Sequence, residues 1–264
     1  GGGIDLNGNV HGSQLLENEI FLNRSDGSGG GVAWANSLSP TLEGNRIFSN
    51  TSGEYGAGVY LYGADGAWIE GNQVFGNEAN GDGGGLALTG SDPVTVVNNM
   101  VWENRTARDG AGIFLGDASA HLLHNTLARN GGGGGEGVYV VWSARAWLTN
   151  TIVVSHDVGI QVGSGATATL QATLWGTSTW ANTLDWSGPG TLFTGTLNFW
   201  GDPAFVDPDG GDYHIGPGSA AIGKGVDAGV ATDIDGDRRI GAPDLGADEY
   251  RVDAYLPLVI RTYP

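Results

Sequence analysis

The sequence predicts an all-β parallel solenoid, in which the chain winds into successive coils of short strands. Three observations predict this fold. A glycine-rich segment followed by alternating apolar residues recurs at intervals of about 27 residues, two asparagine series keep the same interval, and glycine supplies 49 of the 264 residues. The absence of a Gly-X-Y period excludes collagen, and 40% hydrophobic residues with nine tryptophans exclude simple disorder.

Each coil begins with the glycine-rich segment and the strand that follows it. The copies start at Gly1, Gly29, Gly56, Gly83, Gly110, Gly135 and Asp157, at spacings of 28, 27, 27, 27, 25 and 22 residues. Alternation with a period of two over short runs indicates strands, and this much glycine and asparagine would destabilise a helical repeat. Each copy contains three short apolar segments, which predicts three strands per coil of roughly 27 residues, with coils about 4.8 Å apart.

The two asparagine series are expected to form side-chain amide ladders at the corners between strands, because stacking places equivalent residues above one another. The first series is Asn18, Asn45, Asn72, Asn99, Asn125 and Asn150, and the second is Asn23, Asn50, Asn77, Asn104 and Asn130.

The repeat Asn-x-Ile-x-x-Asn…Gly-Gly-Gly-Ile-x-Leu, over residues 1 to about 162, resembles that of bacterial right-handed parallel β-helix proteins. The C-terminal part resembles the choice-of-anchor Q region that ends many secreted β-helix proteins. The matching segments are Asp202–Pro208, Gly211–Ile215, Pro217–Ile222, Asp233–Arg238 and Asp244–Tyr250. These resemblances imply a right-handed coil and an exported bacterial protein that is secreted or held on the cell surface.

Three regions are expected along the chain. Residues 1–162 form the regular β-helix coils, and residues 163–250 form irregular coils and a closing segment of the same domain. Residues 251–264 form a C-terminal tail. The middle boundary rests on the loss of the 27-residue interval, and the closing segment is expected to cover the end of the solenoid, where apolar core and strand edges would otherwise be exposed.

The composition excludes several classes of partner. The formal net charge is −18 and Lys224 is the only lysine, so the surface would repel nucleic-acid phosphates. Cysteine is absent, which excludes disulfides and thiolate metal sites. No run of 18 apolar residues is present, so no transmembrane segment is expected.

Aromatic side chains are the first candidates for a binding surface. The residue after the first inward-facing position of each glycine-led strand should point outward, and several of these positions are aromatic. The expected contacts with a polysaccharide or cell-envelope glycan are Tyr60, Tyr62, Trp68, Phe114, Tyr139 and Trp142. The alternative is that these rings only shield the sheet.

Two carboxylates are the candidate catalytic pair. Glu43 and Glu70 occupy equivalent positions on successive coils, about 4.8 Å apart, which is near the separation of roughly 5–5.5 Å in retaining glycosidases. A solvated surface pair is the alternative, because Leu16 and Val97 occupy the same position on the neighbouring coils. His121 and His124 are expected at the surface and not as metal ligands.

An aspartate-rich segment is the candidate cation site. Alternating Asp233, Asp235 and Asp237, followed by Asp244, could place several oxygen ligands around Ca²⁺. The alternative is a closing loop in which arginines pair with the same carboxylates.

Together these features favour an exported surface or extracellular-matrix module with a structural or adhesion role, which contacts glycans or stacks end to end with further copies into a filament. The alternative is a polysaccharide lyase or glycoside hydrolase that acts on the outer face of the β-helix. Enzyme activity is not favoured, because the Asp-Asp and Gly-His-Gly motifs of polygalacturonases are missing.

Overall fold

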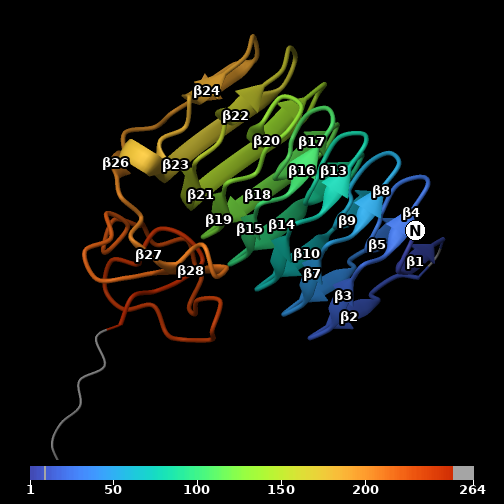
Figure 1. Ribbon diagram of the computed structural model, residues 1–264, viewed down its shortest axis with the longest axis horizontal. Coiled ribbons are helices and arrows are strands. Elements are labelled where there is room, and N and C mark those ends of the chain that lie inside the picture. Colours follow the sequence, from blue (N-terminus) through green and yellow to red (C-terminus); the bar gives the residue numbers. More distant parts are fainter. Residues whose placement is uncertain (9, 252–264) are drawn as a thin grey trace, which may run out of the picture.

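The computed structural model describes residues 1–8 and 10–251, and it confirms a parallel β-solenoid. Successive coils stack along the long axis, from the blue N-terminal coil to the orange coil near β24 (Figure 1). The tail predicted at residues 251–264 lies outside the described residues except for Arg251. No helix among residues 1–8 and 10–251 is long and apolar enough to cross a membrane.

The strand after each glycine-rich segment contributes to an eight-stranded parallel sheet, called the first sheet below. Its strands in spatial order are β1 (Ile4–Asn7), β5 (Val32–Ala35), β9 (Val59–Tyr62), β13 (Leu86–Thr89), β17 (Ile113–Gly116), β20 (Glu136–Val141), β22 (Val158–Val162) and β24 (Leu184–Ser187). The register pairs Val59 with Val32 and Leu86, and all three are fully buried. The alternating pattern therefore places one side of each strand in the core, as predicted.

The second and third apolar segments of each coil belong to a 14-stranded sheet, called the second sheet below. One arm contains β2 (Gln14–Leu16), β6 (Thr41–Glu43), β10 (Ala67–Glu70), β14 (Val94–Val97) and β18 (Ser119–Leu123). The other arm contains β3 (Glu19–Phe21), β7 (Arg46–Phe48), β11 (Gln73–Phe75), β15 (Met100–Trp102) and β19 (Thr126–Ala128). The arms merge in β21 (Arg145–Val154) and β23 (Thr167–Gly176), which pair in turn with β25 (Thr191–Phe193) and β26 (Asn198–Gly201).

Three smaller elements complete the structure. A four-stranded parallel sheet at one corner contains β4 (Arg24–Ser25), β8 (Thr51–Ser52), β12 (Glu78–Ala79) and β16 (Arg105–Thr106). A short 3-10 helix, η1, spans Ser178–Trp180, and an antiparallel hairpin is formed by β27 (Phe205–Asp207) and β28 (Asp212–Ile215).

Buried amide ladders hold the corners of the first five coils together. The backbone and side-chain N–H groups of Asn72 both donate to Oδ1 of Asn99, at 2.9 Å each. Nδ2 of Asn72 also donates to the carbonyl of Leu42 on the preceding coil. Asn72 and Asn99 are fully buried, so these bonds satisfy polar groups that would otherwise cost about 1–3 kcal/mol each.

The prediction for Asn150 was wrong, because the register shifts by one residue in the sixth coil. Leu123 pairs with Thr149, so Asn150 follows the column of His124, and Thr151 follows that of Asn125. Oδ1 of Asn150 accepts from the N–H of Val226, and its Nδ2 donates to the carbonyl of the same residue. Asn150 therefore binds the chain to its C-terminal part and does not extend the ladder.

The second ladder continues further than predicted, through His156 and Asn182. Nδ2 of Asn130 lies 3.2 Å from Nε2 of His156, and the backbone N–H of His156 donates to Oδ1 of Asn182. His124 is also fully buried, beside Asn150, which corrects the expectation that it lies at the surface; His121 is exposed as expected.

The coil architecture continues beyond residue 162. β23 pairs with β21 in a parallel register from Arg145 opposite Thr167 to Val153 opposite Trp175. At the corner, Thr151 and Thr173 stand where asparagine stood in earlier coils, and the two arms join into one strand. The loss of the 27-residue interval after residue 162 reflects this change of corner and not the end of the solenoid.

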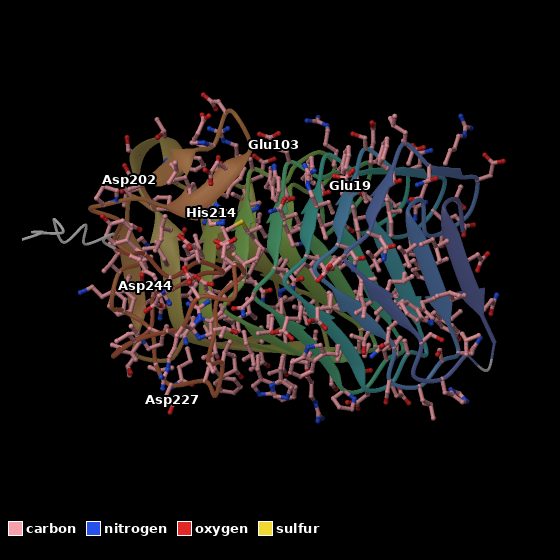
Figure 2. All side chains as sticks on the ribbon, turned by 90° about the horizontal axis from the view of Figure 1, so that it is seen from below. Glu19, Glu103, Asp202, His214, Asp227 and Asp244 are labelled. Atoms are coloured by element: carbon pink, nitrogen blue, oxygen red, sulfur yellow. The ribbon has the colours of Figure 1, made fainter. Side chains whose placement is uncertain are left out.

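Residues 202–250, called the closing segment below, lie along the flank of the coils. Tyr213 packs on Trp102 with ring centroids 5.2 Å apart, and Oγ1 of Thr126 accepts from the N–H of Ala247. His214 and Asp244 lie on this segment toward one end of the molecule (Figure 2). The expectation that the segment covers the end of the solenoid was wrong, because the later coils expose apolar residues on their outer flank that the segment buries.

Candidate functional site

An aromatic cluster covers the outer face of the first sheet between β9 and β20. The rings of Tyr139 and Trp142 lie 5.9 and 5.7 Å from that of Phe114. The ring of Tyr55 lies 6.1 Å from those of both Tyr60 and Phe114. The structure thus joins four of the six predicted aromatic residues through a fifth, Tyr55, which the sequence analysis did not identify.

Tyr55 fits between its neighbours because the strand between them carries a small residue. Ala87 pairs with Tyr60 on one side and with Phe114 on the other, and it is fully buried. Phe114 is only 1% exposed, so its predicted role as a surface contact was wrong. It supports the rings that are exposed.

Two rings on this face are open to solvent. Tyr62 is 48% exposed at the end of β9, and Trp142 is 47% exposed directly after β20. Tyr60 and Tyr139 are partly buried, and burial raises the pKa of both phenols. A flat ligand on this face would therefore meet Tyr62 and Trp142 first.

Three carboxylates border the aromatic cluster. Oε2 of Glu136 accepts from the N–H of Gly110, and Oδ1 of Asp82 accepts from the N–H of Asp109. Glu136 is 1% exposed, and burial raises its pKa, with smaller contributions in the same direction from the charges of Asp109 and Asp82. The same three carboxylates raise the pKa of the Tyr139 phenol, which places their charge beside the rings.

Trp68, Glu43 and Glu70 lie on the second sheet and not on the aromatic cluster. Glu70 on β10 pairs with Glu43 on β6, which is the predicted register. Nε1 of Trp68 donates to Oε2 of Glu70 at 2.7 Å, and Trp68 is 43% exposed. Leu16 and Val97 flank the two carboxylates in register, so the acidic pair is bounded by apolar residues.

The carboxylates of Asp233 and Asp244 organise loops of the closing segment. Oδ1 of Asp233 accepts from the N–H groups of Asp235 and Asp237, and Oδ2 accepts from that of Glu249. The two oxygens of Asp244 accept from the N–H groups of residues 223 and 250. The predicted calcium ligands Asp233 and Asp244 are thus occupied by backbone donors, and Asp237 forms an ion pair with Arg251.

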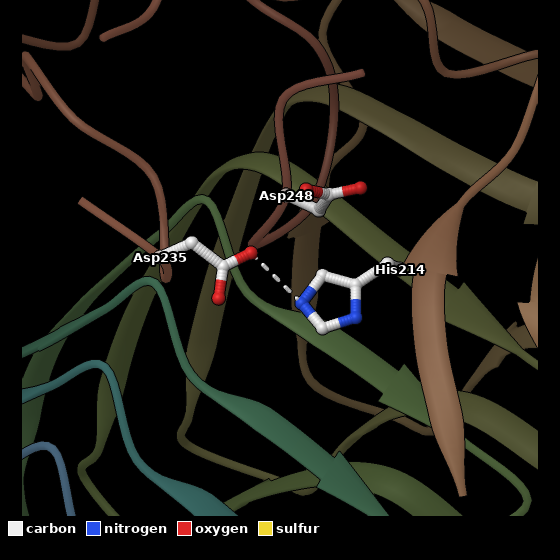
Figure 3. A group of neighbouring side chains, drawn as sticks. All are labelled: His214, Asp235 and Asp248. Atoms are coloured by element: carbon white, nitrogen blue, oxygen red, sulfur yellow. Dashed lines mark ion pairs between the residues drawn. The ribbon is translucent and has the colours of Figure 1, made fainter. Parts of the chain in front are cut away.

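A histidine joins one of the predicted aspartates in a separate cluster. His214 on β28, Asp235 and Asp248 offer ligand atoms that all lie within 4.8 Å of one another (Figure 3). Asp248 is 7% exposed, and burial raises its pKa to about 6. These residues come from three parts of the closing segment, so no local spacing in the sequence could have indicated the cluster.

The comparisons with known proteins agree with this architecture. A family model described as "Right handed beta helix region" matches residues 2–174. A solved structure, described as the crystal structure of pectate lyase Pel9A, aligns with 91% of this chain and 73% of its own chain, at a TM-score of 0.50 and 14% identity. That similarity concerns the fold alone. No curated protein matches the chain in sequence.

Proposed function

The chain belongs to the right-handed parallel β-helix family, and on this scaffold we propose that it is an exported surface or matrix protein that binds neutral polysaccharide. The binding surface is the aromatic cluster of the first sheet. The observation that carries the proposal is the pair of exposed rings, Tyr62 and Trp142, supported by the buried ring of Phe114 and bordered by carboxylates.

The chemistry of this face suits a sugar chain. Aromatic rings offer a rigid apolar surface on which the apolar face of a pyranose can lie, at little cost in side-chain entropy. Carboxylates accept strong hydrogen bonds from hydroxyl groups. Asp82, Asp109 and Glu136 stand beside the rings, so one ligand could contact both kinds of group.

The charge of the protein favours a neutral glycan over a polyuronate. The chain carries a formal charge of −18, and its aromatic face is bordered by three acidic groups. A polyanionic ligand would be repelled there. The resemblance of residues 202–250 to the choice-of-anchor Q region supports export, because that region ends many secreted β-helix proteins.

Affinity gel electrophoresis with a panel of soluble neutral polysaccharides and polyuronates tests the proposal. We expect at least one neutral polysaccharide to retard the protein, and Tyr62→Ala and Trp142→Ala to weaken the retardation. Trp68→Ala is the matched control, because Trp68 is similarly exposed but lies on the second sheet. Retardation by polyuronates alone, or by no polysaccharide, would contradict the proposal.

Polysaccharide cleavage at Glu43 and Glu70 is the second candidate function. Their pairing on adjacent strands and the hydrogen bond from Trp68 favour it, and the similar solved structure is described as a pectate lyase. The assay is release of reducing ends or unsaturated products from the same panel. Activity that is lost in both Glu43→Gln and Glu70→Gln would support this alternative, and no product from any polysaccharide would exclude it for the panel.

A further inference from the structure

We propose that His214, Asp235 and Asp248 bind a divalent transition-metal ion of the zinc type, which joins three parts of the closing segment. His214 lies on β28, Asp235 lies in the turn after Asp233, and Asp248 lies in the last described part of the chain. Figure 3 shows the imidazole facing both carboxylates. This site is separate from the proposed glycan surface.

The distances suit a small metal ion. Nε2 of His214 lies 3.1 Å from Oδ2 of Asp235, and the ligand atoms of all three residues lie within 4.8 Å of one another. Ligands at 2.0–2.1 Å from a tetrahedral zinc ion are about 3.3 Å apart. Oδ2 of Asp248 accepts from the N–H of Ile215, which holds this carboxylate in place.

A fourth residue fixes the orientation of the imidazole. Nδ1 of His214 lies 2.6 Å from Oδ1 of Asp212, two residues earlier on the same strand. A carboxylate only accepts hydrogen bonds, so Nδ1 carries the proton and the lone pair of the neutral ring is on Nε2. Metal-binding histidines commonly have this carboxylate partner on the other ring nitrogen.

The second observation is that Nε2 is buried and has no hydrogen-bond partner. It is 3.1 Å from Asp235, yet the angle does not form a hydrogen bond. Nε2 is therefore directed toward the space between the two carboxylates, where a cation would meet one nitrogen and two oxygens.

The donor set favours zinc over calcium. Imidazole nitrogen and carboxylate oxygen suit Zn²⁺ and its neighbours, whereas Ca²⁺ takes six to eight oxygen ligands. The side chain of Asp235 is 57% exposed, so solvent could supply the fourth ligand. The bound ion would tie the β27–β28 hairpin to the two loops that carry Asp235 and Asp248.

Isothermal titration of the chelator-treated full chain with ZnCl₂ tests the site, with Co²⁺ absorption as a second readout of nitrogen–oxygen coordination. We expect one ion per chain and an increase in melting temperature. Asp235→Asn should abolish stoichiometric binding without unfolding the chain, because its side chain is exposed. Asp212→Asn should raise the dissociation constant by about 10- to 100-fold, since Asp212 acts as a positioning residue.

His121→Ala is the control for adventitious binding, because His121 is an exposed histidine on β18 whose ring stacks on Trp147. It should leave zinc affinity and stoichiometry unchanged. The proposal is overturned if zinc does not bind, if Asp235→Asn binds as tightly as the wild type, or if Ca²⁺ binds at the same concentration while Zn²⁺ does not.

Discussion

The indole of Trp142 lies directly over Gly116 on the preceding coil, so that a Cβ atom added to Gly116 would stand 2.4 Å from Cζ3 of the ring. Glycine at this position lets the ring lie against the sheet. The exposed surface of Trp142 therefore depends on the absence of a side chain at residue 116.

Gly116→Val should displace Trp142 and lower both stability and affinity for glycan. Overpacking of this kind costs about 1–3 kcal/mol. Urea denaturation and affinity electrophoresis measure the two effects. Gly131→Ala is the control, because a Cβ there meets no atom within 4 Å. Unchanged affinity in Gly116→Val would show that the ring is not held in this position.

Asn72→Ala should be among the most destabilising changes in the solenoid. It removes the acceptor for two N–H groups of Asn45 and the donor to the carbonyls of Leu42 and Glu70. We expect a loss of about 3 kcal/mol in the free energy of unfolding, measured by denaturant titration. Asn18→Ala, at the exposed start of the same ladder, should cost less than about 1 kcal/mol. Equal losses would contradict a cooperative buried ladder.

The stability of the solenoid should fall in mild acid because of His156. Burial lowers the pKa of its imidazole to about 4. An unfolded histidine has a pKa near 6.5, so the unfolded state takes up the proton first as the pH falls. The stability that this neutral ring contributes is complete above pH 6.5 and is lost between about pH 6.5 and 4, by up to about 3 kcal/mol.

His156→Asn removes the titrating group and keeps an amide between Asn130 and Asn182. Denaturation from pH 7 to 4 should show a smaller decrease in unfolding free energy than in the wild type. His121→Asn, on the exposed face of β18, should retain the wild-type pH dependence. A variant that follows the wild-type curve would show that His156 does not cause the decrease.

Arg239 should anchor the closing segment to the coils. Its side chain is 3% exposed and donates to Oδ1 of Asn98 and to the carbonyls of Gly246 and Ala247. Arg239→Met leaves Glu249 buried without its partner, which costs about 3–5 kcal/mol.

Hydrogen exchange locates that loss. We expect faster exchange in residues 213–250 of Arg239→Met, while the first coils keep their protection. Arg24→Met, which removes an exposed ion pair with Asp26, should change neither region. Uniformly faster exchange throughout the chain would show that the closing segment does not open as a separate unit.

The solenoid could be predicted because each coil repeats the same local requirements. Asn45, Asn72 and Asn99 recur at the interval of one coil, and the structure stacks them as expected. The sixth coil failed because one residue is lost between Gly131, which pairs with Arg105, and Val138, which pairs with Ile113. A fixed interval then assigned Asn150 to the wrong column.

The parts of the site that depend on contacts between distant residues could not be predicted. Tyr55 lies in a turn, and its position above Ala87 follows from the size of a residue on the next coil. Phe114 was expected outside because alternation indicates the side of the sheet but not what covers it. His214 and Asp248 meet only after the closing segment has folded against the flank.

Glycan binding by the first sheet is the central claim, and one comparison tests it most directly. Dissociation constants for the best neutral polysaccharide of the panel should be measured for the wild type, Trp142→Ala and Trp68→Ala. We predict that Trp142→Ala raises the constant by at least about tenfold, since a buried stacking ring is worth 1.4 kcal/mol or more, and that Trp68→Ala does not change it. Equal constants for the wild type and Trp142→Ala, or a loss confined to Trp68→Ala, would contradict the account.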